Sequence, residues 1–393
     1  MASERTIRGI VAIAGIGETR YYKRGAAPDP EFKLVLEAIL SAAEDAGIDA
    51  REIDGFASYS NDRNDPARLQ SALGIPHIGL SSMFWGGGGG GGSGAVGNAA
   101  AAIAAGYCDV AVVYRGLAQG QFGRFGQGAR VNTISGGASF TQPYGLMSPA
   151  QTFAMRVRRF MHDHGIRQEA LRAISLASYF HAQQNPRAVM HGRPLTEEDY
   201  DNSRWIVEPF HLFDCCMEND GAAAVILVAA ERAKDLKQRP AYILAAQQGS
   251  AYRQAATAHN APDYATSNFK TLAPRLYAQA GVGPGEVDVL QSYENFTGGV
   301  LMSMVEHGFC PPEEVNDFFS LENLQAPGGR LPLNTSGGNL AECYMHGLEL
   351  ITEAVKQIRG TSYNQVPEVN ISMVTSGPMV QPVSNLILAK EAH

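Results

Sequence analysis

The first segment that could do chemistry is a tract of seven consecutive glycines, 86–92, followed by Ser93, Gly94 and an alanine-rich stretch. Glycine allows a backbone to approach a ligand closely, and N–H groups at a helix N-terminus attract negative charge. A flexible linker is the alternative, but ordering seven glycines beside a buried helix would cost much entropy. We therefore favour an anion-binding loop. No Gly-Lys-Ser/Thr ends the tract, which disfavours a nucleoside triphosphate site.

Two further segments carry acid–base side chains. QSYENF places Tyr293 at the end of an expected strand, and AECYMHG places Tyr344 and His346 just inside an expected helix after Gly337 and Gly338. A phenol with a pKa near 10 is a poor base at neutral pH but a fair acid and hydrogen-bond donor. A neighbouring donor, such as His346 or a helix N-terminus, could lower that pKa. Tyrosine and histidine are more often packing residues, so these residues alone leave their roles open.

The elements around the glycine tract indicate an α/β fold. Apolar runs predict strands at 8–17, 55–60 and 109–116, while helical spacing and small residues predict helices at 30–49 and 94–106. This β-α-β-α-β order predicts a mainly parallel sheet with helices on its faces. The alanine-rich helix must pack tightly on all sides, which places its start deep in the fold.

The pattern then changes over residues 117–204, which we interpret as an insertion with helices near 148–164 and 168–184. Such insertions often carry specificity loops. Its apolar residues could line a sterol-sized pocket or pack the insertion onto the core, which is the more common outcome. These residues include Phe140, Tyr144 and Met147.

A second half repeats the theme more loosely, with a small-residue loop that leads into a helix and then into an apolar strand. Its expected strands lie at 240–250, 287–295 and 368–377, and its expected helices at 267–281, 298–308 and 341–359. We therefore divide the chain into two related halves that share one site. The first half comprises 1–116 and 205–239, the insertion 117–204, and the second half 240–393.

Composition and charge disfavour several classes of protein. With 393 residues and 45% hydrophobic content the chain can bury a large core, and its net charge of −8 disfavours nucleic acid as a partner. No apolar run approaches the roughly 18 residues of a membrane span, and the N-terminal apolar run suits a buried strand better than a signal peptide. Five cysteines lack CxxC or metal-site spacing, which favours a reduced, cytoplasmic protein without a bound metal. They are Cys108, Cys215, Cys216, Cys310 and Cys343.

Four motifs resemble the thiolase superfamily. NTSGGNLAECYMHG (334–347) is similar to the thiolase pattern Asn-x-x-Gly-Gly followed by Gly-His-Pro, and SYENF (292–296) stands at the His-Asp-x-Phe or Asn-Glu-x-Phe segment. LFDCCMENDGAAAVIL (212–227) resembles the strand containing Asp-Gly-Ala-Ala. PYGLMSPAQTFAMRVRRFMHDHG (143–165) is similar to the sterol-carrier-protein-type branch. The resemblance spans almost the whole chain and implies two related βαβαβ halves in a five-layer αβαβα sandwich with a loop insertion.

Departures from the pattern change the expected activity. Gly91 stands at the position of the thiolase nucleophilic cysteine, Tyr344 replaces the histidine of Gly-His-Pro, and Tyr293 begins the segment that usually begins with His or Asn. The C-terminal catalytic cysteine is also missing, since the strand end reads VTSGPMV around Gly377. The chain thus resembles the thiolase-like aldolases of bacterial steroid side-chain degradation, in which two tyrosines take over.

This resemblance implies retro-aldol cleavage of a β-hydroxyacyl-CoA, which needs no covalent intermediate and no cofactor beyond the CoA thioester substrate. One of Tyr293 and Tyr344 would deprotonate the β-hydroxyl and the other would protonate the enolate. The missing cysteine at Gly91 would leave room for a bulky substrate. Supporting residues would be His346, Gly91 and Asn295, and CoA or substrate would contact Gly92, Ser93, Gly337, Gly338 and Gly377.

Alternatives remain at this point. A degradative thiolase would need free CoA, and a catalytically silent subunit would only support a partner enzyme. Cys343 could be an unusual nucleophile, but in a helix its side chain would point about 100° away from that of Tyr344. The resemblance further implies a homodimeric core and a small OB-fold, zinc-ribbon acyl-CoA-associated partner, together a heterotetramer. No nucleic acid or membrane partner is expected.

Overall fold

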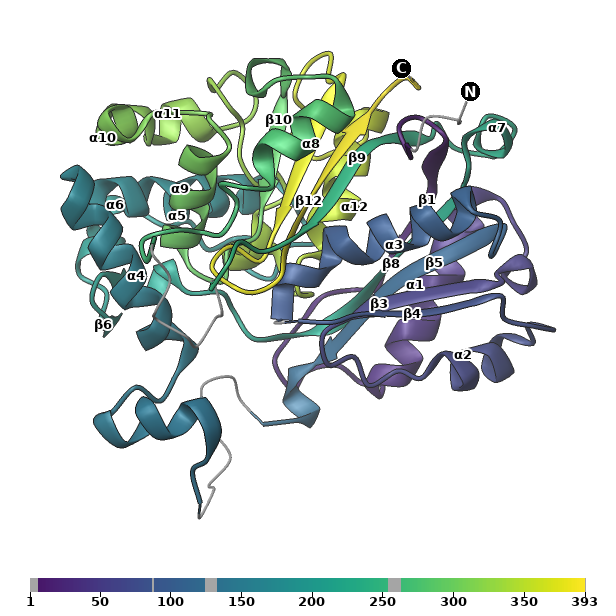
Figure 1. Cartoon of the computed structure of the whole chain (residues 1–393), viewed down its shortest axis with the longest axis horizontal. Coiled ribbons are helices and arrows are strands. Elements are labelled where there is room, and N and C mark those ends of the chain that lie inside the picture. Colours follow the sequence, from purple (N-terminus) through teal and green to yellow (C-terminus); the bar gives the residue numbers. More distant parts are fainter. Residues whose placement is uncertain (1–5, 87, 124–132, 254–262, 393) are drawn as a thin grey trace.

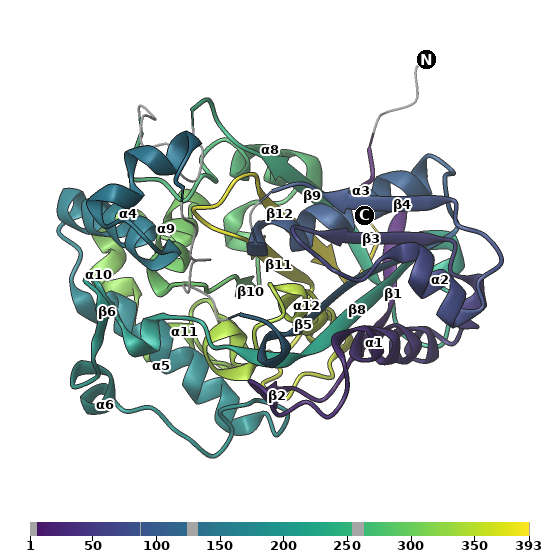
Figure 2. The ribbon, with the colours of Figure 1, turned by 90° about the horizontal axis from the view of Figure 1, so that it is seen from below.

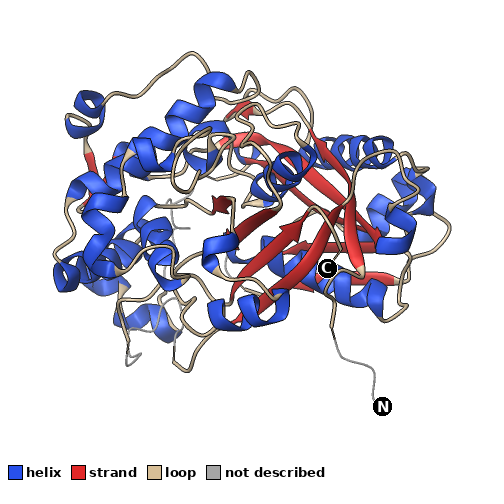
Figure 3. Ribbon diagram, turned by 90° about the horizontal axis from the view of Figure 1, so that it is seen from above, coloured by secondary structure: helices blue, strands red, loops and turns tan. Residues whose placement is uncertain are grey.

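A mixed β-sheet forms the centre of the fold, with helices on both of its sides (Figures 1 and 3). The structure is a computed structural model that describes residues 6–86, 88–123, 133–253 and 263–392. The strands of the first half are β1 (Val11–Glu18), β2 (Tyr22–Lys23), β3 (Gly55–Tyr59), β4 (Leu80–Phe84), β5 (Val110–Ala118) and β8 (Asn219–Ala229). Those of the second half are β9 (Ala241–Gly249), β10 (Val289–Ser292), β11 (Ile371–Ser376) and β12 (Val383–Ala389).

The two halves have the same strand topology. In the first, β3 pairs in parallel with β5, which pairs antiparallel with β8, and β8 pairs antiparallel with β1. In the second, β10, β11, β12 and β9 repeat that order and those directions. Antiparallel pairing of β1 with β9 joins the halves. The two predicted related halves are therefore confirmed.

The prediction of a mainly parallel sheet is wrong. Only the pairs β3–β4, β3–β5 and β10–β11 are parallel among the described strands of this sheet. The strand that closes each half, β8 or β12, returns antiparallel instead of through a crossover helix. Parallel neighbours need a helical crossover, whereas β12 follows β11 after a short loop.

Helices cover the strands in three layers, which completes the predicted five-layer sandwich. Helix α1 (Glu31–Ala46) covers one face of the first half, beside β8 and β5 (Figure 2), and α8 (Ala273–Ala280) covers the strands β9 and β12 of the second. Between the two sets of strands lie α3 (Gly92–Ala104) and α12 (Leu348–Arg359). The alanines and glycines of α3 allow this close packing, since Ala95, Ala99 and Ala100 are fully buried.

Local signals explain several helix ends. Helix α1 follows Pro30 and ends at Ala46, just before Gly47, whose φ of 77° is left-handed, as the sequence indicates. Ser148 caps α4 (Pro149–His164) in a capping box with Gln151. None of the helices in the described ranges is long and apolar enough to cross a bilayer.

The two helices predicted within the insertion are confirmed as α4 and α5 (Gln168–Gln184), and α5 packs on α9 (Thr297–Glu306). A small ribbon of β6 (Trp205–Val207) and β7 (Phe210–His211) lies beside α4. The remaining α-helices are α2 (Pro66–Leu73), α6 (Glu197–Asp201), α7 (Ala230–Ala233), α10 (Val315–Phe318) and α11 (Leu321–Leu324).

The apolar residues of the insertion do not share one environment. Phe153, Val157 and Phe160 of α4 are buried in the core, which confirms the packing alternative for them. Phe140, Tyr144 and Met147 are 81%, 85% and 61% exposed, so they do not pack on the core, and their lining of a substrate pocket stays a prediction. Phe140 and Tyr144 are the last residues of two short helical turns, Gly136–Phe140 and Gln142–Tyr144, and Met147 follows the second turn. These turns extend away from the rest of the molecule at the lower left of Figure 1.

Candidate active site

Two tyrosine hydroxyl groups meet in the centre of the molecule. Tyr293 directly follows β10, and Tyr344 lies just before α12. Their hydroxyl oxygens are 2.5 Å apart, and both side chains are buried. The structure therefore brings together the two residues that the sequence selected as catalytic, although they are 51 positions apart.

The segment that carries Tyr344 and His346 is not helical, which corrects the predicted helix at 341–359. A π-helical turn covers Gly338–Glu342, Cys343 is extended with a φ of −167°, and α12 begins only at Leu348. Side chains replace the missing helical hydrogen bonds. Asn219 Oδ1 accepts from the Tyr344 N–H at 2.6 Å, and Glu349 Oε1 accepts from the Met345 N–H at 3.1 Å.

Backbone strain accompanies this break. His346 has a φ of 51°, in the left-handed region that non-glycine residues rarely adopt, and Gly347 follows with a φ of 87°. Such conformations persist where surrounding contacts enforce them, and they concentrate at functional sites. Tyr59 supplies such contacts, because its hydroxyl donates to the carbonyl oxygens of His346 at 3.1 Å and Met345 at 3.3 Å.

The glycine tract forms a packing surface for these aromatic rings. A Cβ on Gly89 would lie 1.8 Å from Cζ of Tyr293, and one on Gly91 would lie 2.4 Å from Cβ of Tyr59. A Cβ on Gly377, which has a φ of 66°, would lie 2.2 Å from Cα of Gly90. Any larger residue at these positions would displace the site. Gly87 lies outside the described residues.

The contact between Gly91 and Tyr59 corrects one expectation. The space next to Gly91, where a thiolase carries its nucleophile, was expected to admit a bulky substrate. The aromatic ring of Tyr59 occupies that space instead. The position of the cysteine is thus closed by the protein itself.

The first turn of α3 is tied to the second half of the fold. The Ser93 N–H donates to Ser376 Oγ at 3.2 Å, the two serine hydroxyls lie 2.8 Å apart, and the Gly94 N–H donates to Ser384 Oγ at 2.9 Å. A Cβ on Gly92 would make only ordinary contacts, the nearest at 3.5 Å from Ser376 Oγ. Substrate binding by Gly92 and Ser93 stays a prediction. The N–H groups of Ser93 and Gly94 already donate to the serine hydroxyls of the second half.

The other predicted binding glycines form the turn before Tyr344. Gly337 and Gly338 have φ values of 111° and 55°, and a Cβ on Gly338 would lie 2.1 Å from Glu294 Oε2. Asn295 Oδ1 accepts from the Phe296 N–H at 2.9 Å. These contacts give the three residues a structural role. Substrate binding by Gly337 and Gly338 and the supporting role of Asn295 stay predictions.

Burial raises the pKa of both Tyr293 and Tyr344 well above 10, so the expectation of a lowered tyrosine pKa is wrong. Loss of solvent outweighs the neighbouring donors. Their mutual hydrogen bond, which either oxygen can donate, lowers the pKa of Tyr293 and raises that of Tyr344. Both phenols are therefore neutral at neutral pH.

The thiols near the site are also un-ionised. Burial raises the pKa of Cys216 to about 12, against a hydrogen bond with Tyr344 that lowers it, and burial raises that of Cys343 well above 9. Because Cys343 is extended rather than helical, its side chain and that of Tyr344 point to opposite sides of the backbone. The described residues contain no group of three or more His, Cys, Asp or Glu that could hold a metal ion.

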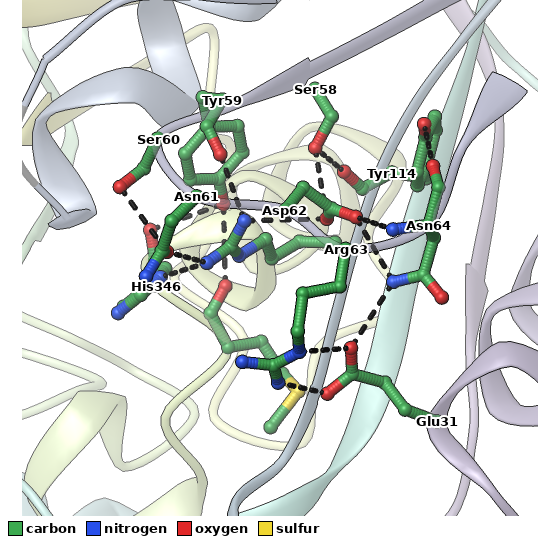
Figure 4. A network of polar contacts seen from close by, with 12 residues as sticks. Glu31, Ser58, Tyr59, Ser60, Asn61, Asp62, Arg63, Asn64, Tyr114 and His346 are labelled. Atoms are coloured by element: carbon green, nitrogen blue, oxygen red, sulfur yellow. Dashed lines mark hydrogen bonds and ion pairs between the residues drawn. The ribbon is translucent and has the colours of Figure 1, made fainter. Parts of the chain in front are cut away.

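Sequence reasoning missed three residues of the site: Tyr59, Arg115 and Cys216. Arg115 lies in β5, where every residue is buried, and contacts Tyr59, Asn61, Asp62 and His346, four residues that are labelled in Figure 4. A charged residue inside an apolar strand was a usable signal for it, because arginine is almost never fully buried without partners. Tyr59 and Cys216 carried no such local signal.

Known proteins resemble this chain over nearly its whole length. A steroid side-chain-cleaving aldolase of Thermomonospora curvata is 40% identical over 395 residues, which cover 98% of each chain. A 17-hydroxy-3-oxo-4-pregnene-20-carboxyl-CoA lyase of Mycobacterium tuberculosis is 40% identical over 390 residues, 97% of this chain and 100% of the relative. The Thiolase C-terminal domain-like family matches residues 249–390.

Solved structures agree. A structure described as Ltp2-ChsH2(DUF35) aldolase matches with a TM-score of 0.91 and 39% identity over 98% of both chains. An acetyl-CoA acetyltransferase of Syntrophomonas wolfei matches at 0.69 with 15% identity, over 98% of this chain and 99% of the other, and shows the fold alone. The chain therefore belongs to the thiolase superfamily, in the branch of the steroid side-chain-cleaving aldolases, and is a carbon–carbon lyase.

Proposed function

We propose that the chain cleaves a β-hydroxyacyl-CoA by a retro-aldol reaction. The substrate is a CoA thioester with a steroid at its β-carbon, and the products are a ketone and a short acyl-CoA such as propionyl-CoA. The observation that carries this proposal is the buried contact of two tyrosine hydroxyls beside a closed nucleophile position. Relatives at 40% identity that are named as an aldolase and a carboxyl-CoA lyase support the substrate class.

The raised pKa of both tyrosines favours a relay over a standing phenolate base. In this relay Tyr344 donates the hydrogen bond to Tyr293. The Tyr344 oxygen takes the proton of the β-hydroxyl and passes its own proton to Tyr293. Tyr293 gives its proton to Cα as the Cα–Cβ bond breaks and the β-carbon becomes a carbonyl. The electron pair of the broken bond ends in the new Cα–H bond, so both phenols finish neutral.

Such a relay suits a dry site. Neither oxygen carries a full charge for long, so burial does not oppose the reaction as it would oppose ionisation. The negative charge that develops on the thioester oxygen still needs hydrogen-bond donors, and loss of one such donor typically costs about 2.7–4 kcal/mol. In this proposal, backbone N–H groups near Gly91 contribute to that role.

The decisive experiment separates an aldolase from a thiolase. The protein, with its partner, would be given a steroid β-hydroxyacyl-CoA without free CoA, and the products would be identified by mass spectrometry. We expect a ketone and a short acyl-CoA in equal amounts. A requirement for free CoA, or an acyl adduct on any cysteine in the intact mass, would contradict the proposal.

We also propose a homodimeric core that binds a DUF35-type partner and forms a heterotetramer. The structural neighbour whose description names ChsH2(DUF35) supports this partner, at 39% identity over 98% of the chain. In this proposal the partner is a small OB-fold, zinc-ribbon protein, and any zinc belongs to it. The isolated chain should then show weak activity, and full activity without a partner would contradict the assembly.

A further inference from the structure

Arg115 is buried in the layer that contains the tyrosine pair. Strand residues alternate in direction, so Arg115 shares a face of β5 with Ala111, Val113 and Leu117, which pack in the same cluster as Tyr293 and Tyr344. Its side chain is 1% exposed. A buried guanidinium is costly unless hydrogen bonds and an opposite charge compensate it.

The partners of Arg115 provide that compensation (Figure 4). Nη1 donates to the Tyr59 carbonyl oxygen at 2.8 Å and lies 3.3 Å from the buried carboxylate of Asp62. Nη2 donates to Asn61 Oδ1 at 3.0 Å and lies 2.7 Å from Nδ1 of His346. The guanidinium is thus fixed at both ends, and one end faces the imidazole.

The contact with Nδ1 determines the proton position on His346. Arginine remains protonated in proteins and has only donors, so Nδ1 must accept the hydrogen bond. The proton of the neutral imidazole then sits on Nε2. Protonating Nδ1 as well would place a second cation 2.7 Å from the guanidinium, inside the protein.

The imidazole is held beside the catalytic pair. Its ring lies edge-on to that of Tyr344, with centroids 5.1 Å apart and an angle of 83° between planes. Figure 4 shows one ring nitrogen of His346 directed at the guanidinium and the other directed away from the network. Tyr59 holds the backbone of the same residue through its carbonyl oxygen.

We propose that Arg115 is a positioning residue that holds His346 as the neutral Nε2–H tautomer, so that His346 donates a hydrogen bond to the thioester oxygen of the substrate. This inference rests on the proposed retro-aldol function. A neutral imidazole can stabilise the developing enolate oxygen by a hydrogen bond without transferring a proton to it. An imidazolium is more acidic and would tend to protonate that oxygen. The proton then reaches Cα only through the tyrosines.

The charges around His346 keep it neutral across the working range. Arg115 faces it from β5, Arg63 adds positive charge from the loop after β3, and the neutral phenols of Tyr344 and Tyr59 contact its ring and its carbonyl oxygen. Burial, then Arg115 and Arg63, hold the pKa of His346 well below its usual 6.5. Lowering the pH from 8 to 6 should therefore leave it uncharged.

Nitrogen-15 NMR of the histidine-labelled protein tests the tautomer directly. The only variant it needs is His346→Gln, which assigns the His346 resonances. We expect the His346 resonances to show a protonated Nε2 and an unprotonated Nδ1, unchanged between pH 8 and 6. A proton on Nδ1, or titration of the ring in that range, would overturn the inference.

The role of the donor is tested by activity. His346→Leu should lower kcat/KM about 10²-fold or more, the loss typical for one oxyanion donor. His346→Gln keeps a neutral N–H donor and should recover a large part of that loss. Equal loss in both variants would overturn the donor role.

The role of Arg115 needs a variant that removes the buried ion pair as a unit, Arg115→Met with Asp62→Asn. We expect His346 to become a mixture of Nδ1–H and Nε2–H forms in this variant, because nothing then holds Nδ1 as an acceptor, and its pKa to rise only in part, because burial and Arg63 still lower it. The kcat/KM should fall with the loss of the Nε2–H form, and most at low pH. An unchanged tautomer and pH profile would overturn the assignment of Arg115. If Tyr293→Phe and Tyr344→Phe instead stay active while His346 keeps its Nε2 proton, the retro-aldol relay fails and the tautomer assignment stands.

Discussion

The central helices α3 and α12 occupy equivalent places in the two halves, yet their N-termini differ. Both follow glycine-rich segments. Helix α3 starts at once at Gly92, and serine hydroxyls from the second half bind its first free N–H groups. Helix α12 starts late, at Leu348, and leaves the segment 343–347 outside the helix. The glycine tract before α3 thus supplies a backbone surface without side chains, and the second half supplies the two tyrosines.

This difference shows how one fold can change its chemistry. A nucleophile at the start of α3 would need a side chain at Gly91, but Tyr59 fills that space. The delayed start of α12 provides the extended backbone that directs Tyr344 at Tyr293 and holds His346 beside it. Each side of the comparison can be tested by substitution.

The largest effect should come from the second half. Tyr344→Phe and Tyr293→Phe each remove one oxygen of the relay and should lower kcat about 10²–10⁴-fold, the range for general acid–base catalysis. Acyl-CoA release from a β-hydroxyacyl-CoA is the measurement. Tyr277→Phe is the matched control, because it removes a hydroxyl that binds the His307 carbonyl oxygen at 2.9 Å, outside the pair. Near-normal turnover in both site variants would reject the relay.

An intermediate effect should come from the first half. Gly91→Cys restores the thiolase residue type, but its Cβ would lie 2.4 Å from Cβ of Tyr59. Overpacking of this kind costs about 1–3 kcal/mol of unfolding free energy. We expect a lower melting temperature and no acyl-cysteine by intact mass. Gly92→Ala is the control for stability, since its new Cβ makes ordinary contacts and alanine favours a helix.

If Gly91→Cys were as stable as the parent and formed an acyl adduct, the closed position would be refuted. The two central helices would then differ only in residue type and not in accessible space.

A pH-dependent effect concerns Glu349, whose side chain accepts the Met345 N–H at the break before α12. Burial raises its pKa to about 8 from 4.5. Between these values the folded state binds one proton more than the unfolded state, so stability should fall as the pH rises through this window, by at most about 1.4 kcal/mol per pH unit. Glu349→Gln, which can still accept at its Oε1, should flatten that slope in thermal unfolding from pH 5 to 8.

The exposed Glu322→Gln serves as the control for a lost carboxylate and should leave the slope unchanged. An identical slope in Glu349→Gln and the parent would mean that Glu349 is ionised in the folded state.

Much of the fold could be predicted because its signals are local. The strand and helix patterns around α1, α3, α4 and α5 gave their positions to within a few residues. The helix at 341–359 failed because helical spacing continues through 343–347, while Asn219, a residue more than a hundred positions away, accepts the Tyr344 N–H. Sheet direction failed for a similar reason, since the order of elements does not reveal which strands become neighbours.

The amino-acid sequence by itself determined the superfamily, the missing nucleophile at Gly91 and the pair of tyrosines, because residue types at motif positions carry that information. Only the tertiary structure decided that Tyr59 closes the vacated position and that burial keeps the phenols neutral. It also brought Arg115 to His346 across 231 residues of chain. Desolvation and long-range contact depend on every surrounding layer, so no local pattern contains them.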